Sequence, residues 1–100
     1  MYIFIRGDLS IPQQIIQSAH AVDELNKVYP HRSQNHIVLC DAENEQSLFG
    51  VSDFLTHHGI KHRMFYETDI SSHTAIATVP LCGKECQPLK RLGKSILKQK

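Results

Sequence analysis

Two carboxylates lie two residues apart where an apolar segment ends. Glu67 and Asp69 follow the run "IKHRMFY", and "ISS" comes after them. A carboxylate at the end of a strand can orient a water for attack on a carbonyl, or accept a hydrogen bond from a ribose hydroxyl. Asp and Ser side chains in turns also bond to their own backbone. Turn formation is therefore an alternative explanation for both acids.

Three histidines, His57, His58 and His62, are close together in the sequence. Zinc binding needs three or four ligands that converge in space. Neighbouring side chains on a helix point about 100° apart, so His57 and His58 diverge. The end of a helix also stabilises partly charged histidines without a metal. We therefore expect no metal at this cluster.

The cysteines and the first residues indicate where the protein works. Cys40, Cys82 and Cys86 are an odd number without zinc-knuckle spacing, whereas secreted disulfide scaffolds carry dense, even sets. The start "MYIFIRGD" has neither a basic leader nor a cleavage site. No apolar run reaches the roughly 18 residues of a membrane span. We expect a soluble, cytoplasmic protein.

Hydrophobic periodicity predicts the elements that must position these side chains. Continuous apolar and β-branched runs indicate buried strands, and apolar residues at helical spacing indicate helices. The expected strands span residues 1–6, 36–40, 60–67 and 73–80. The expected helices span residues 11–27, the segment between Asp41 and Gly59, and a segment that begins at Pro88.

Both longer helices carry start signals. Ser10 suits an N-cap, Pro12 suits the first turn, and Gln13 completes a capping box. Asp41 is the expected cap of the second helix, with Glu43 and Glu45 as the acids of its first turn. Helical spacing predicts the core face of the first helix to be Ile15, Ile16, Ala19, Val22 and Leu25.

The order of the elements, β-α-β-α-β-β-α, predicts the fold. Strands that alternate with helices form βαβ units, and two strands joined by a short turn form an antiparallel hairpin. We predict one α/β domain over residues 1–100, with a four-stranded mixed sheet flanked by helices on both faces. Ligands of such sheets bind beyond the carboxyl ends of strands. Here those ends carry "RGDLSIPQQ", "CDAEN" and "YETD".

Charge is distributed unevenly along the chain. The net charge is +1, yet residues 1–80 hold five basic and nine acidic side chains, and residues 81–100 hold six basic and one acidic. A basic tail on a mildly acidic body can contact phosphates. It can equally be a solvated helix face.

The segment "IRGDLSIPQQIIQSAHA" resembles the opening of the type-2 peptidyl-tRNA hydrolase family, in the form found in a compact bacterial and phage branch. The family pattern is a strand, an Arg-x-Asp-Leu turn and a helix with Gln-x-x-His-Ala. It is matched by Arg6, Asp8, Leu9, Gln17, His20 and Ala21. Residues 36–80 resemble the second half of the family, including an acidic turn and a Thr-containing strand that ends at Pro. The resemblance covers about residues 2 to 80.

This resemblance implies a hydrolase that acts in translation. It would cleave the ester between a peptide and the 3′ ribose of tRNA, would need no cofactor, and could form a homodimer. The implied catalytic residues are Gln13, His20, Glu67 or Asp69, and Thr74. The substrate-binding candidates are Arg6, Asp8 and Gln17 from the resemblance, and Lys90, Arg91 and Lys94 from the basic tail.

Two other functions suit the same residues. Family members usually carry a lysine at the position of Gln13, and a glutamine supplies N–H donors but no charge. A catalytically impaired relative would then bind a nucleotide or a tRNA end without cutting it. The third hypothesis is a protein-interaction module that uses the sheet edge or the basic tail.

Overall fold

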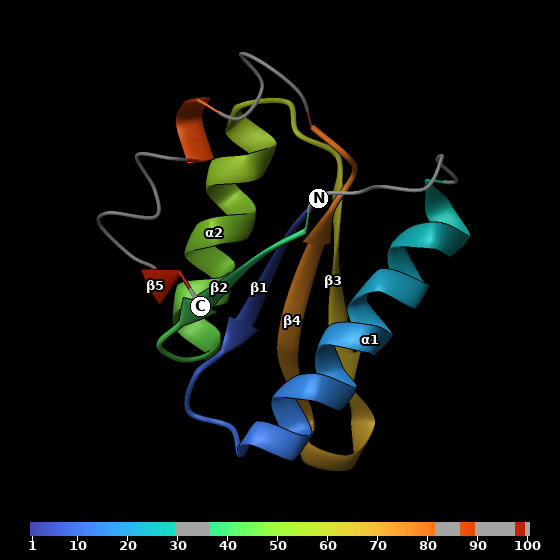
Figure 1. Cartoon of the computed structure of the whole chain (residues 1–100), viewed down its shortest axis with the longest axis vertical. Helices are drawn as coiled ribbons and strands as arrows, with labels where there is room; N and C mark the ends of the chain where they lie inside the picture. The colour runs from blue at the N-terminus through green and yellow to red at the C-terminus, as the bar shows by residue number, and fades with distance from the viewer. Residues whose placement is uncertain (30–36, 82–86, 90–97, 100) are drawn as a thin grey trace.

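The computed structural model of the chain describes residues 1–29, 37–81, 87–89 and 98–99 (Figure 1). The first half of the chain forms β1 (Tyr2–Arg6), α1 (Ile11–Val28), β2 (Val38–Ala42) and α2 (Glu45–His57). The second half forms β3 (His62–Glu67), the short 3-10 helix η1 (Thr68–Ile70), β4 (Ser72–Thr78) and β5 (Lys98–Gln99).

The strands form a mixed sheet in the order β3-β4-β1-β2-β5. β1 pairs with β2 in parallel and with β4 antiparallel, and β3 and β4 form the predicted antiparallel hairpin. The four predicted strands are confirmed, and the two-residue β5 adds to the side of β2. Residues 87–89 are helical. The rest of the helix predicted from Pro88 lies outside the described residues.

One helix covers each face of the sheet, as predicted. Figure 1 shows α2 and α1 on opposite sides of the strands. Phe4 packs with Leu48, Val51 and other residues on the α2 side, whereas Ile3 and Ile5 pack with residues on the α1 side. The continuous apolar run of β1 follows from this arrangement, because a strand covered on both faces has no solvent-facing side.

The predicted core face of α1 is wrong in part. The buried residues of the helix are Gln14, Gln17, Ala21 and Leu25, while Ile15 is 67% and Ile16 48% exposed. Ala19 is also exposed. Two glutamines can face the sheet because their amides are hydrogen-bonded there; Gln14 Nε2, for example, donates to the Leu9 carbonyl at 2.9 Å. Residue polarity therefore predicted Val22 and Leu25 correctly and failed for Ile15, Ile16 and Ala19.

The helix starts confirm one cap and correct the other. Ser10 caps α1, with its hydroxyl oxygen accepting from the Gln13 N–H at 3.3 Å, and Pro12 lies in the first turn. Asp41, the expected cap of α2, instead lies within β2, opposite Ile5. The pairing with β1 extends β2 to Ala42, so α2 begins later, and Asn44 caps it by accepting from the Ser47 N–H at 3.0 Å.

The hairpin between β3 and β4 contains a register shift. Phe65 pairs with Ala75, but the next residue, Tyr66, pairs with His73. Thr74 is therefore the extra residue in β4, and such a bulge redirects a side chain. The turn itself is η1, followed by Ser71 with a left-handed φ of 48°. Within the described residues, no helix combines the length and the apolarity that crossing a membrane requires.

Candidate functional site

The side chain of Gln17 is the centre of a buried hydrogen-bond network. Its Oε1 accepts from the Thr74 hydroxyl at 2.8 Å. Its Nε2 donates to Glu67 Oε1 at 2.9 Å and to Gln13 Oε1 at 3.2 Å. Gln17 is only 1% exposed, and each polar atom of its amide has a partner. We call Gln13, Gln17, Glu67 and Thr74 the Gln17 network.

Three elements bring the Gln17 network together. Gln13 and Gln17 are one helical turn apart on α1, which places their side chains on the same flank. Glu67 is the last residue of β3. Thr74 is the bulged residue of β4 and is completely buried. The bulge directs the Thr74 hydroxyl toward α1, and the antiparallel hairpin places it near Glu67.

Glu67 is the ionised group of the network. The hydrogen bond from Gln17, the Asp69 backbone N–H at 3.4 Å and the nearby His20 hold the pKa of Glu67 below its ordinary value, and this outweighs the opposing effect of burial. The carboxylate is half-buried. Two oxygens offer about four acceptor positions, so capacity is left for a water or a substrate hydroxyl.

His20 lies on the same flank of α1, outside the network. Its ring is exposed and stacks on Phe65, with ring centroids 4.7 Å apart and planes 13° apart. One face of the imidazole therefore packs on β3. This stacking partner could not be identified from the sequence, because it depends on how α1 is placed over the hairpin.

The two acids of the turn take different places. The carboxylate of Glu67 belongs to the network, whereas Asp69 contributes its backbone N–H to Glu67 and is itself exposed. The turn interpretation is therefore confirmed for Glu67, and its role as a site acid stays a prediction. Glu67 caps η1 by accepting from Asp69 and also accepts from Gln17.

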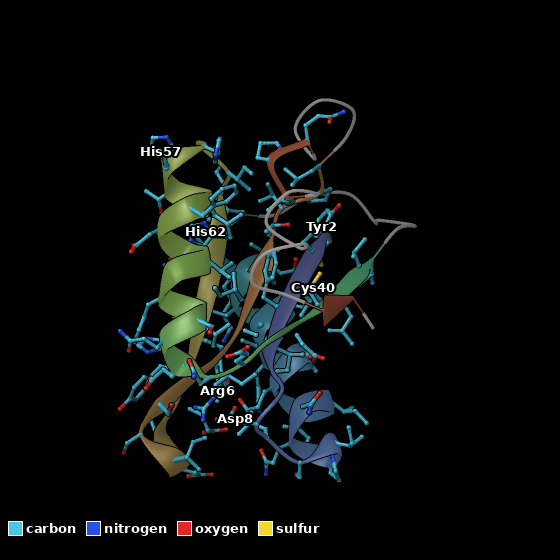
Figure 2. All side chains as sticks on the ribbon, turned by 90° about the vertical axis from the view of Figure 1, so that its left-hand side faces the viewer. Tyr2, Arg6, Asp8, Cys40, His57 and His62 are labelled. Atoms are coloured by element: carbon cyan, nitrogen blue, oxygen red, sulfur yellow. The ribbon has the colours of Figure 1, made fainter. Side chains whose placement is uncertain are left out.

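Arg6 and Asp8 lie on the α2 face of the sheet, apart from the Gln17 network. Arg6 Nε and Nη2 donate to the two Asp8 oxygens at 2.9 and 2.8 Å. Its Nη1 donates to the Ser72 hydroxyl and to the His73 carbonyl. Figure 2 shows Arg6 and Asp8 side by side at the end of β1, at the opposite end of α2 from His57. The pair fastens β1 to the start of β4.

Glu45 completes this second group. The sequence indicated Glu45 only as an acid of the first turn of a helix and not as a site residue. Its Oε2 accepts from the His73 backbone N–H at 2.8 Å and approaches His73 Nδ1 at 3.3 Å. The backbone hydrogen bond is the main cause that lowers the pKa of Glu45. We call the residues of this group the Arg6 cluster; they are Arg6, Asp8, Glu45, Ser72 and His73.

The remaining chemical candidates lie elsewhere. His62 Nε2 is 2.9 Å from the Ser52 hydroxyl, and its Nδ1 is 2.8 Å from the Ile60 carbonyl oxygen. In the described part of the chain, no three His, Cys, Asp or Glu side chains are grouped to hold a metal ion. Burial raises the pKa of the free Cys40 thiol to about 11. The other candidates lie outside the described residues; they are Cys82, Cys86, Lys90, Arg91 and Lys94.

No protein-family model matches this chain, and comparison with curated proteins likewise gives no match. A function must therefore be argued from the site itself. Its chemical content is an ionised carboxylate, a buried amide that orients it, and an exposed imidazole on the same side of the sheet.

Proposed function

We propose that this protein hydrolyses the ester between an acyl or peptidyl group and the 3′ ribose of tRNA. The observation that carries the proposal is the buried amide of Gln17, which joins Glu67, Thr74 and Gln13 from three separate elements. These are residues that the resemblance to type-2 peptidyl-tRNA hydrolases implicates. Convergence on one side chain is what a shared site requires.

In the proposed reaction, Glu67 orients the attacking water. The water oxygen attacks the acyl carbon as its proton passes to the carboxylate. The carboxylate then gives this proton to the ribose oxygen, which leaves as a hydroxyl group when the acyl–oxygen bond breaks. Because its pKa is low, Glu67 is ionised at neutral pH but is a weak base. Its main contribution is therefore to hold the water in the direction of attack.

Gln17 and Thr74 act in this proposal as positioning residues. The Thr74 hydroxyl donates to Gln17 Oε1, which leaves the Nε2 end of the amide directed at Glu67. The exposed amide of Gln13 donates to the developing oxyanion through its Nε2, since its Oε1 is used by Gln17. The exposed face of His20 contacts the terminal nucleoside. The basic side chains Lys90, Arg91 and Lys94 attract the tRNA phosphates.

The direct test is release of N-acetyl-amino acid from N-acetyl-aminoacyl-tRNA by the purified protein. We expect turnover that Asp69→Asn retains, because only the backbone of Asp69 contacts Glu67. Absence of release above background at micromolar protein would refute hydrolysis.

A binding function without turnover is the second candidate. The hydrogen bonds that link the Gln17 network come from amides and a hydroxyl, and none comes from a lysine or arginine. An oxyanion would receive little charge stabilisation from such donors. Salt-dependent tRNA binding without cleavage would identify this function. A Gln13→Lys variant that gains cleavage would then show that the missing charge prevents it.

A further inference from the structure

Among the described residues, the outer edge of β3 has no neighbouring strand. In the part of the chain that the structure describes, β3 is the last strand of the sheet, and β4 is its only neighbour. The Val79 N–H donates to the Lys61 carbonyl at 3.0 Å. Backbone groups alternate along an antiparallel strand. Residues 61, 63 and 65 therefore face β4, and residues 62, 64 and 66 turn their N–H and C=O groups outward.

Charges along this edge are segregated by sign. Lys61 immediately precedes β3 and Arg63 is its second residue, whereas Glu67 is its last residue and Asp69 lies in the turn beyond. Proteins often protect an exposed edge with charges that repel a second strand. Here an antiparallel second copy of β3 would instead place opposite charges across from each other.

We propose that two copies of this chain pair antiparallel along β3, with Phe65 facing Phe65 on the twofold axis. In this register Met64 lies opposite Tyr66, so two outward-facing residues meet and can share backbone hydrogen bonds. Arg63 lies opposite Glu67 as a non-hydrogen-bonded pair, the type whose side chains are closest. Lys61 precedes β3 and Asp69 lies in η1, so the charge pairs within the paired strands are the two between Arg63 and Glu67. Centring the axis on Met64 would place Arg63 opposite Phe65 and Lys61 opposite Glu67, so the Arg63–Glu67 pairs would be lost.

This pairing places a cation beside the Gln17 network. Arg63, Phe65 and Glu67 share the α1 face, since they contact Glu24, His20 and Gln17 respectively. Arg63 of the second copy would lie next to Glu67. The Arg63 side chain is 43% exposed and contacts Glu24 through a single nitrogen, so other donors are available. The pairing is independent of the proposed hydrolysis, but it would supply the charge that Gln13 lacks.

Cysteine cross-linking tests the register. In a background of Cys40→Ala, Cys82→Ser and Cys86→Ser, mild oxidation of Phe65→Cys should give a covalent dimer on non-reducing gels. Residues directly opposite in a non-hydrogen-bonded pair have Cα atoms about 4.5 Å apart, within disulfide reach. Arg63→Cys, on the same strand and face, is the matched control, because its two copies lie far from the axis. Equal cross-linking of both variants would overturn the register.

A charge swap tests the pairing itself. Wild type should sediment as a dimer, and Arg63→Glu should weaken the dimer by about 100-fold or more, because like charges then face each other twice. Arg63→Glu combined with Glu67→Arg should restore it. Circular dichroism would establish that each variant is folded. A monomeric wild type, or a double variant as weak as the single one, would overturn the proposal whether or not the protein hydrolyses tRNA esters.

Discussion

Two groups of polar side chains occupy the same end of the sheet, one on each face. On the α2 face, the Arg6 cluster is built from charges that satisfy each other. Arg6 holds Asp8 with two parallel hydrogen bonds, and Glu45 binds both the backbone and the ring of His73. Bidentate and charge-assisted bonds of this kind fix geometry strongly. They leave little capacity for a ligand, so the cluster fits a structural role.

On the α1 face, the Gln17 network is organised differently. A neutral, buried amide holds one carboxylate, and Glu67 has no salt-bridge partner among the described residues. An ionised group with unused acceptor positions beside an exposed ring can take part in chemistry. Of the two groups, the Gln17 network keeps spare bonding capacity and is therefore the better candidate for a site.

Removing one carboxylate from each group should give the largest difference in activity between the two groups. Glu67→Gln should lower hydrolysis of N-acetyl-aminoacyl-tRNA by about 100-fold or more, because an amide can neither hold the water with an ionised oxygen nor accept its proton. Glu45→Gln should lower the urea midpoint of unfolding and leave the rate per folded molecule nearly unchanged. Equal loss of rate in both variants would contradict the assignment of Glu67.

Two buried threonines of β4 provide the next comparison. Thr74→Val leaves Gln17 Oε1 without its donor, which should cost about 1–3 kcal/mol of unfolding free energy. It should also lower kcat by about tenfold to a hundredfold through misplacement of Glu67. The control is Thr78→Val, since Thr78 accepts from the Tyr2 N–H at 2.9 Å at the far end of β4.

Thr78→Val should therefore destabilise the protein and leave kcat unchanged. Thr74→Ser, which keeps the hydroxyl, should recover most of the lost activity. A Thr74→Val enzyme with reduced stability but normal kcat would show that Thr74 has only a structural role.

The fold was largely predictable because its signals are local. A strand covered on both faces needs a continuous apolar run, which β1 has, and the cap at Ser10 needs only the next three residues. The stripe of α1 that faces the sheet was predictable only in part from residue polarity. Gln17 can be buried only because Glu67 and Thr74 lie opposite it, and those contacts span at least fifty positions of the chain.

The candidate site was predictable only in part for the same reason. The resemblance indicated Gln17, Glu67 and Thr74, and the structure brings them together. Nothing in the sequence separates Arg6 from that group, because its position on the opposite face follows from the alternation of β1 and from its bonds to Asp8 and β4. The bond between Glu45 and His73 joins α2 to β4 and has no local signal.

The dependence of activity on pH tests whether Glu67 is the carboxylate that acts. Its folded-state pKa lies below the ordinary value of 4.5, so the ionised form persists as the pH falls from neutral to about that value. The rate should be flat over this range and should decline only below it. A rate that already falls near neutral pH would indicate a different base.

The carboxylates on both faces of the sheet should make stability depend on pH in the same direction. The pKa values of Glu45 and Glu67 are both lowered in the folded state. The stability that they contribute is fully present above their ordinary pKa and is lost as the pH falls through the folded values. Glu45→Gln and Glu67→Gln should each reduce the acid sensitivity of the thermal midpoint. If neither variant does so, the hydrogen bonds on these carboxylates do not favour the ionised form.

The smallest effect is expected at His20. If its exposed face stacks on the terminal nucleoside, His20→Ala should raise KM by about fivefold to tenfold, the lower end of measured base-stacking effects. The value of kcat should stay unchanged, since the imidazole lies outside the Gln17 network. His20→Phe should keep a low KM, because a second aromatic ring preserves the stacking. His57→Ala is the matched control at the far end of α2, and an equal change in its KM would argue against stacking at His20.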